Sequence, residues 1–404
     1  MTKSEFQQLA YLNKKVSLSM LFSEILGQEH LKSHLVKSAD NGRISHAQLF
    51  VGPEGCGTLP MAIAYARYIL CRNKNKENEG GNESCNLKFK NFSHPDLHFA
   101  FPVAATDKVK SHPVSNHFMA EWRQLLAEQP YGNLFDWYKL LDIENKQGQI
   151  GVDEAQDIVK ALSLKSYEGG YKVMIIWMAE KMNIAASNKL LKLIEEPPNK
   201  TVFILIAEDE GQIINTIRSR CQVLHFPRLA ESVIRDALIK NFDLDEPTAT
   251  TIAHQSDGNY NKACDLVYRD SEDLEFEAWF VSLMRGAFKA QRDKSAIHNL
   301  LKWSEEMAKT GRETQKKFLL FCLDFFRQAM LLNYEVPQLV YVAPKTENFK
   351  LENFAPYVHG DNILQICEEL QSAIYEIERN GNSKIIFTDL SIKLTRQIYL
   401  KEGS

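Results

Sequence analysis

The sequence predicts an α/β domain with a parallel sheet, followed by two helical regions. A strand-like segment runs into a glycine-rich turn and then into a helical segment, all within residues 46–70. Two continuous apolar runs, residues 171–180 and 201–207, are typical of strands that are buried on both faces of a parallel sheet. After residue 228 the strand patterns stop and helical periodicity continues. This order of segments indicates the start of a nucleotide-binding layout with helical regions attached.

The glycine-rich turn has the outline of a phosphate-binding loop. Its glycines are Gly52, Gly55 and Gly57. In a working loop, backbone N–H groups surround the phosphates, a Lys reaches the β- and γ-phosphates, and a Ser or Thr hydroxyl binds Mg²⁺. Thr58 and Leu59 occupy the Lys and hydroxyl positions, so the charge and the metal ligand are missing. We therefore expect Gly52, Gly55, Gly57 and Thr58 to form a vestigial, non-functional phosphate loop. Taken alone, the segment fits an ordinary glycine-rich turn equally well.

A second feature of an ATPase is missing after the apolar run at residues 171–180. In ATPases of this architecture the strand ends in Asp-Glu, where the Asp belongs to the Mg²⁺ shell and the Glu orients the attacking water. Trp177 and Met178 occupy these positions, and neither side chain can hold a metal or polarise water. Glu180 is the nearest acid, and we expect it to face solvent.

The other segments of the α/β domain are predicted from apolar periodicity and from the prolines and glycines that end them. Strands have continuous apolar runs, whereas helices have apolar residues at a 3.6-residue period. Helices are expected within residues 22–37, 61–70, 151–162, 185–198 and 213–221, and further strands within 94–103 and 222–226.

Residues 104–150 interrupt this layout as an insertion that is rich in aromatic residues. Aromatic residues at helical spacing more often form a core than a platform for a ligand, and we expect a core here. These residues are Phe118, Trp122, Tyr131, Phe135, Trp137 and Tyr138.

Three domains are predicted from these segments. Residues 1–228 form the nucleotide-binding-like domain, residues 229–270 a small helical domain, and residues 271–404 a larger helical domain. Amphipathic helices are clearest at residues 233–239, 247–253, 261–267, 276–288, 318–332, 363–377 and 385–399.

The composition is that of a globular protein without a strong charge. The 404 residues carry a net charge of −4, so any contact with nucleic acid would be local or made through partners. The N-terminus has no apolar signal core, and no apolar run approaches the roughly 18 residues that span a membrane. We expect a cytoplasmic protein without a membrane contact.

The seven cysteines are odd in number and scattered, which argues against a disulfide framework and favours reducing cytoplasm. Cys71 and Cys85, with His94 and His98 nearby, are the residues that could belong to a zinc site. A structural zinc site needs about four ligands, usually in close pairs, and the sequence has no C-x-x-C pair. We therefore expect neither zinc nor another metal.

Two short motifs at a specific spacing resemble the clamp-loader branch of the AAA+ proteins. They are Ile194-Glu-Glu-Pro-Pro198 and Ser219-Arg-Cys221. The resemblance covers about residues 20–270, and it implies an AAA+ domain followed by a helical lid and an all-helical collar. Because the gamma and tau motor subunits of that family keep their ATP-binding groups, the degenerate loop is most similar to that of the delta prime type of subunit of the bacterial DNA polymerase III clamp loader.

The resemblance implies a role for Arg220. In that family the arginine of Ser-Arg-Cys reaches across a subunit interface to ATP that a neighbour holds, and the match assigns this role in trans to Arg220. A guanidinium is always charged, and its rigid fork of donors suits phosphoryl oxygens. The alternative is an Arg packed beside a helix C-terminus, where the dipole favours a cation. The family's first-sensor position falls near residues 207–208 and its second-sensor Arg aligns with Asn261, so both depart from the family pattern.

The resemblance thus implies a subunit of the DNA polymerase III holoenzyme that does not hydrolyse ATP and has no cofactor of its own. The expected partners are delta and gamma/tau subunits and, through the complex, the sliding clamp and primer–template DNA. Two alternatives remain open: an active gamma/tau-type motor ATPase, and an AAA+-like scaffold unconnected with replication. Direct DNA contact could involve Lys189, Lys192 and Lys200, but a solvated helix face explains these lysines equally well.

Overall fold

The computed structural model divides into two compact units. One comprises Met1–Ile143 and Gln147–Tyr268, and the other comprises Glu144–Lys146 and Arg269–Ser404. The residues that the structure describes are 20–71, 83–144, 146–167, 170–267, 272–290, 293, 295–336, 340, 344, 346 and 349–400.

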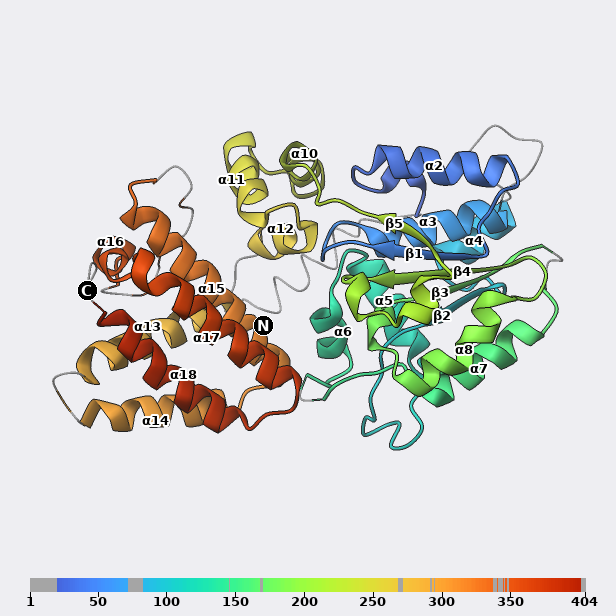
Figure 1. Cartoon of the computed structure of the whole chain (residues 1–404). Helices are drawn as coiled ribbons and strands as arrows, with labels where there is room; N and C mark the ends of the chain where they lie inside the picture. Colours follow the sequence, from blue (N-terminus) through green and yellow to red (C-terminus); the bar gives the residue numbers. More distant parts are fainter. Residues whose placement is uncertain are drawn as a thin grey trace, which may run out of the picture. The chain divides into compact units, whose positions relative to one another are not determined.

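A five-stranded parallel sheet is the centre of the first unit, with the strand order β2-β3-β4-β1-β5 (Figure 1). The strands are β1 (Ala47–Val51), β2 (Leu97–Ala100), β3 (Lys172–Ile176), β4 (Thr201–Ala207) and β5 (Gln222–His225). The residues of β1, β3 and β4 are buried throughout, which the continuous apolar runs at residues 171–180 and 201–207 predict for β3 and β4. The predicted α/β class with a parallel sheet is confirmed. Because the strands are parallel, their carboxyl ends meet at one edge, where open α/β sheets bind their ligands.

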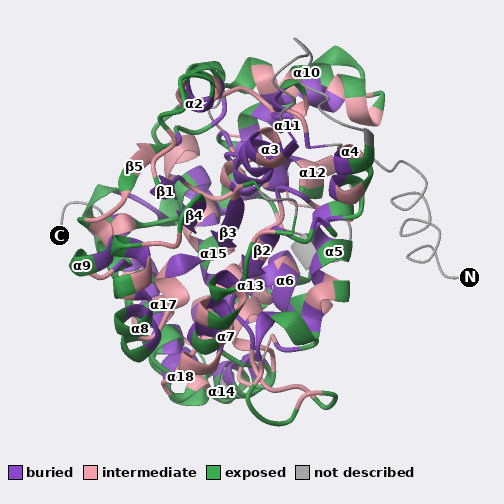
Figure 2. Ribbon diagram, turned by 90° about the vertical axis from the view of Figure 1, so that its right-hand side faces the viewer, coloured by how far each residue is buried: buried purple, intermediate pink, exposed green. Residues whose placement is uncertain are grey.

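Helices cover both faces of this sheet. In the sheet domain they are α2 (Glu29–Asp40), α3 (Thr58–Cys71), α4 (Glu83–Lys90), α5 (Met119–Glu128), α6 (Leu134–Leu140), α7 (Val152–Ser163), α8 (Ile184–Glu195) and α9 (Asn215–Arg218). Single 3₁₀ turns lie at Phe22–Glu24, Ser115–Phe118, Ala179–Lys181 and Glu210–Gln212. One hydrophobic core joins α2 to α6 with one sheet face, and a second joins α7 to α9 with the other (Figure 1). Figure 2 shows α3 as a buried helix, which fits its apolar composition on all sides.

Most of the aromatic residues of the insertion, Phe118, Trp122, Trp137 and Tyr138, form part of the first of these cores, as expected. The Trp122 ring stacks on Phe101 with centroids 4.3 Å apart and lies 5.1 Å from the Trp177 ring. The Trp137 ring meets Trp122 edge-on at 5.3 Å. All six aromatic residues singled out in the insertion are buried: Phe118, Trp122, Tyr131, Phe135, Trp137 and Tyr138.

Three helices with a small core of their own complete the first unit. They are α10 (Glu231–Phe242), α11 (Glu246–Ser256) and α12 (Tyr260–Val267). Their core includes Ile234, Leu238 and Ile252, together with Tyr131 from the insertion. The insertion is therefore in direct contact with this helical part of the unit.

Within its described residues, the second unit consists of helices joined by turns and irregular segments, with no strand. Its helices are α13 (Glu272–Ala290), α14 (Ser295–Met307), α15 (Arg312–Asn333), α16 (Leu351–Phe354), α17 (Gly360–Glu378) and α18 (Ser383–Ile398), with a 3₁₀ turn at Ala355–Tyr357. Phe280 is at the centre of its core, with its ring 4.4 Å from Phe325, 5.4 Å from Phe326 and 5.6 Å from Phe354 between centroids. This confirms the prediction of a helical C-terminal region.

Two predictions of helices need correction. The helix expected from residue 22 begins at Glu29, because Gly27 and Gln28 have φ values of +56° and +60°, which no right-handed helix contains. The segment of α4 was not predicted as a helix. Apolar periodicity does not reveal α4, because this short helix carries five polar and only three apolar residues.

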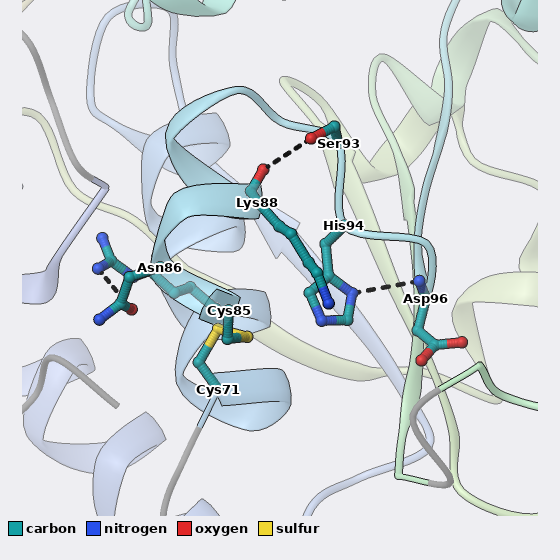
Figure 3. Close-up of a disulfide and its surroundings, with 8 residues drawn as sticks. Cys71, Cys85, Asn86, Lys88, Ser93, His94 and Asp96 are labelled. Carbon is teal, nitrogen blue, oxygen red and sulfur yellow. Dashed lines mark hydrogen bonds between the residues drawn. A yellow bond between two sulfur atoms is a disulfide. The ribbon is translucent and has the colours of Figure 1, made fainter. Parts of the chain in front are cut away.

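The expectation that the cysteines form no disulfide is also wrong. Cys71 at the end of α3 and Cys85 in α4 are bonded, with Cα atoms 5.5 Å apart (Figure 3). Beside the bond, Arg67 Nη2 donates to Asn86 Oδ1 at 2.8 Å, a second link between the two helices. The two sulfurs considered as zinc ligands are thus bonded to each other. A count of cysteines cannot reveal that two successive helices bring one pair into bonding distance.

Candidate functional site

The glycine-rich turn lies at the carboxyl end of β1 and leads into α3. Gly55 and Gly57 have φ values of +71° and +96°, a conformation that side chains with a Cβ rarely adopt. The turn borders a small cavity, whose lining also includes Trp177 and Met178 at the end of β3. The structure therefore brings these residues together with Gly52, Gly55, Gly57, Thr58 and Leu59 at one edge of the sheet.

Tyr131 of the insertion lies directly against this turn. A Cβ atom added to Gly57 would come within 3.1 Å of Tyr131 Cε1. The Tyr131 hydroxyl accepts a hydrogen bond of 2.9 Å from the Leu26 N–H, and its ring packs edge-on against Tyr260 at 5.0 Å. Burial raises the pKa of the Tyr131 hydroxyl, so this group stays neutral. An aromatic ring of the same chain therefore occupies the space beside the turn.

Glu54 links the turn to the insertion and to the helices that follow the sheet. Its Oε1 atom accepts hydrogen bonds from Asn133 Nδ2 and from Asn259 Nδ2, each 3.0 Å long. The Tyr260 N–H donates to the Gly55 carbonyl at 3.2 Å. A Cβ atom on Gly55 would lie 1.9 Å from Asn259 Oδ1, so only glycine fits this contact. The turn therefore carries a carboxylate, whose charge repels an anionic phosphate.

Asp136 makes a second link between the same segments. Its Oδ2 atom accepts from the Asn133 N–H and from Asn261 Nδ2, both at 2.9 Å. Asn133 Oδ1 in turn accepts from the Asp136 N–H at 2.9 Å, which completes a capping box at the start of α6. Asn261, which stands at the second-sensor position of the resemblance, is thus engaged with the insertion.

The space left at the turn is small. The cavity measures about 30 Å³, whereas pockets for small molecules typically have about 300–1,000 Å³. Tyr131, Trp177 and Met178 are at most 7% exposed, so their side chains are packed in place. The arrangement holds its own segments together, and the cavity beside the turn is much smaller than a typical small-molecule pocket.

Glu180 does not face solvent as expected. Its Oε1 atom accepts a hydrogen bond of 3.1 Å from the Glu208 N–H, and burial raises the pKa of its carboxyl group. The reason is the turn after β3, where Met178 has a φ of +53° and a 3₁₀ turn brings the chain back toward the end of β4. Glu180 itself is not part of the lining of the cavity.

Arg220 lies in the turn after α9, outside the lining of this cavity. Its Nη1 donates to the Thr216 carbonyl at 2.9 Å and its Nη2 to Glu195 Oε1 at 3.3 Å. Its Nε lies 3.1 Å from Glu195 Oε2, an ion-pair contact without hydrogen-bond geometry. The side chain is 32% exposed. The bond to a carbonyl at the end of α9 agrees with the alternative of an Arg at a helix C-terminus, while the remaining exposure leaves the guanidinium accessible.

Sequence reasoning missed the residues that fill and brace the turn. These are Glu54, Asn133, Asp136, Asn259 and Tyr260, and Tyr131 was predicted only as core. The Asn133-x-x-Asp136 spacing is a visible helix-start signal. Its contact with the turn is not visible, because Asn133 and Glu54 are 79 positions apart and Asn259 and Glu54 are 205 apart.

Among the residues that the structure describes, no helix is both long and apolar enough to cross a membrane. Nor do three or more His, Cys, Asp or Glu side chains gather there in a way that could hold a metal ion.

Comparisons with known proteins give consistent matches. A family model described as DNA polymerase III, delta subunit, matches residues 27–230, about half of the chain. The DNA polymerase III subunit tau of Bacillus subtilis (strain 168) is 24% identical over 395 residues, which cover 92% of this chain and 61% of the relative. The subunit delta prime of the same organism is 29% identical over 261 residues, which cover 63% of this chain and 64% of the relative. The chain thus spans less than two thirds of the length of these relatives.

Among solved structures, a DNA polymerase III gamma-subunit-related protein from Thermotoga maritima matches with a TM-score of 0.35 and 13% identity, over 91% of this chain and 99% of that one.

Proposed function

The chain belongs to the family described as DNA polymerase III, delta subunit, in the clamp-loader branch of the AAA+ proteins, and from this premise we propose that it is a non-hydrolysing clamp-loader subunit of the delta prime type. In this role it assembles with delta and gamma/tau subunits. The complex loads a sliding clamp onto primer–template DNA, and a neighbouring subunit binds and hydrolyses the ATP.

The observation that carries the proposal is the occupied edge of the sheet. Tyr131 and the Glu54 network occupy the place beside the glycine-rich turn, and about 30 Å³ remain. Thr58 and Leu59 supply neither the cation nor the Mg²⁺ ligand of a working loop. Electrostatic clamps on a phosphoryl group in transfer contribute several kcal/mol to the transition state, so their joint loss is incompatible with useful turnover.

Arg220 is the residue through which this chain would assist ATP hydrolysis at the site of a neighbouring subunit. Its guanidinium is about one third exposed, and its backbone is fixed by a hydrogen bond of 3.0 Å from its N–H to the Ile217 carbonyl. An arginine supplied in trans stabilises the charge that develops on the phosphoryl oxygens. This proposal combines the resemblance of Ser219-Arg-Cys221 to the family motif with an accessible, ordered side chain.

A gamma/tau-type motor is the second candidate, because the tau relative aligns with 92% of this chain. The occupied cleft argues against it, since four groups needed for turnover are replaced by Thr58, Leu59, Trp177 and Met178. A scaffold unconnected with replication is the third. Failure of the chain to co-purify with delta and gamma/tau subunits of its own cell would favour that scaffold.

The test is reconstitution with those partner subunits. We expect the purified chain to show no ATP hydrolysis above background and the complex to show DNA-stimulated hydrolysis. Arg220→Ala should leave assembly intact and lower the rate at the neighbouring site by at least ~100-fold, since a finger in trans contributes about 10³–10⁵.

Arg218→Ala is the matched control for this experiment. Arg218 is the last residue of α9, two residues before Arg220, and its Nη2 donates to Asn215 Oδ1 at 3.2 Å. Its removal should leave hydrolysis unchanged. Equal hydrolysis by the wild-type and Arg220→Ala complexes would remove Arg220 from the mechanism, and hydrolysis by the purified chain would favour the motor.

A further inference from the structure

Glu195 and Arg220 are held at fixed positions by the core beneath them. Glu195 is the last residue of α8 and follows Ile194, which is fully buried. The Arg220 N–H donates a hydrogen bond to the carbonyl of Ile217, and Ile217 is also fully buried in the same core. Both side chains therefore project from anchored backbone, and they meet at the surface, where Glu195 is 52% and Arg220 32% exposed.

The position of Glu195 is unfavourable for α8 itself. The free carbonyls at a helix C-terminus create a partial negative charge, which disfavours a carboxylate in the last turn. Glu196 adds a second acid at the same end. An exposed ion pair contributes little to stability, so helix stability does not explain this acid. The contact with the guanidinium of Arg220 therefore explains why an acid stands at this position.

The contacts of Arg220 orient its guanidinium without using all of it. A guanidinium has five N–H donors in a fixed plane. One N–H of Nη1 donates to the Thr216 carbonyl, and one N–H of Nη2 donates to the Glu195 carboxylate. Within the described residues, these bonds leave one N–H on each terminal nitrogen for an acceptor from outside. Two such donors, held in one plane, match two oxygens of a phosphoryl group.

From this geometry we infer that Glu195 is a positioning residue: together with the Thr216 carbonyl, it holds the Arg220 guanidinium so that its two outer N–H groups face the phosphoryl oxygens of ATP on a neighbouring subunit. The inference rests on the proposed function, because it requires Arg220 to act in trans. Glu195 makes no contact with the nucleotide. By its contact it restricts the Arg220 side chain to few conformations, so less conformational entropy is lost when the transition state forms.

The test uses the reconstituted complex with Glu195→Ala, Glu195→Gln and the control Glu196→Ala. Glu196 is exposed at the same helix end and is not among the partners of Arg220 in the described structure. Hydrolysis that depends on Arg220 is the difference between the wild-type and Arg220→Ala complexes. We expect Glu195→Ala to lower the kcat of this Arg220-dependent hydrolysis about tenfold, with the KM for ATP unchanged. A loss of this size is within the range that a small misplacement of a catalytic group can cause. Glu195→Gln keeps an acceptor and should lose less, and Glu196→Ala should lose nothing.

A double variant separates positioning from a general effect on folding. If Glu195 acts only through Arg220, the complex with both Arg220→Ala and Glu195→Ala hydrolyses ATP at the rate of Arg220→Ala alone. A further, additive loss would overturn the inference. So would unchanged or faster hydrolysis by Glu195→Ala, and in that case the effect of Arg220→Ala would still support the proposed function. If Arg220→Ala itself changes nothing, both this inference and the role of Arg220 in trans fail. Assembly of each variant, measured by size-exclusion chromatography, serves as the folding control.

Discussion

Glu154 is a buried acid whose charge state depends on pH near neutrality. Burial raises the pKa of its carboxyl from the usual 4.5 to about 7, although the Ser115 N–H donates to Oε2 at 2.5 Å. Asp157, on the same helix, raises this pKa further. The Ser115 hydroxyl donates to the Phe101 carbonyl and accepts from its N–H, so Glu154 stabilises the segment that follows β2.

The stability of the first unit should therefore fall as pH rises. Below about pH 4.5 the carboxyl is protonated in both the folded and the unfolded chain. Between about 4.5 and 7 the unfolded chain loses this proton first, so the folded chain binds more protons and its stability decreases. Glu154→Gln should remove this contribution, on the order of 3 kcal/mol between pH 4.5 and 8.

Urea unfolding of both proteins across this pH range is the measurement. The free energies of unfolding should separate in favour of the variant as pH rises, whereas a constant difference would mean that Glu154 has an ordinary pKa. Asp153→Asn, which changes an exposed acid on the same helix, is the control.

Among elements, the insertion and the glycine-rich turn depend on each other. Tyr131 and Asn133 come from the insertion and contact the turn through Gly57 and Glu54. A working phosphate loop leaves this space open for the nucleotide. Under the proposed function, the missing chemical groups and the filled space are two separate obstacles to ATP binding.

Restoring the chemical groups alone should consequently fail. The double substitution Thr58→Lys with Leu59→Thr supplies the cation and the hydroxyl. Tyr131 still fills the space beside the turn, and the carboxylate of Glu54 still repels a phosphate. We expect no ATP binding up to about 1 mM in fluorescence titrations, the upper range of ordinary enzyme affinities. Adding Tyr131→Ala and Glu54→Ala should produce weak binding, unless the variant unfolds, which circular dichroism would reveal. Tight binding by the double substitution alone would show that the space opens readily.

The elements themselves were largely predictable, because burial on both faces gives strands β3 and β4 nearly continuous apolar runs. The meeting of Thr58, Trp177 and Met178 was predictable for a related reason, since the ends of parallel strands share one edge. The occupancy of that edge by Tyr131 was not, because it depends on a contact between segments far apart in the sequence. The disulfide between Cys71 and Cys85 was missed for a different reason: its partners are only 14 residues apart, but α4, which carries Cys85, has little apolar periodicity and was not predicted.

At the scale of the whole molecule, the chain combines an occupied site with an accessible cation. The turn, the insertion and helix α12 are joined by the bonds of Glu54 and Asp136, so the first unit is held together without a nucleotide. Arg220 lies outside the cavity lining, in the turn after α9. We propose that the helical second unit, with its own core around Phe280, supports assembly with the partner subunits.

The central claim is that this chain fills its own nucleotide site and acts on ATP held by a neighbour. Isothermal titration calorimetry of the purified, full-length chain with ATP and Mg²⁺ tests it most directly. The claim predicts no saturable binding up to about 1 mM ATP. Saturable binding with a Kd of about 10 µM or lower, which corresponds to roughly −7 kcal/mol, would contradict it.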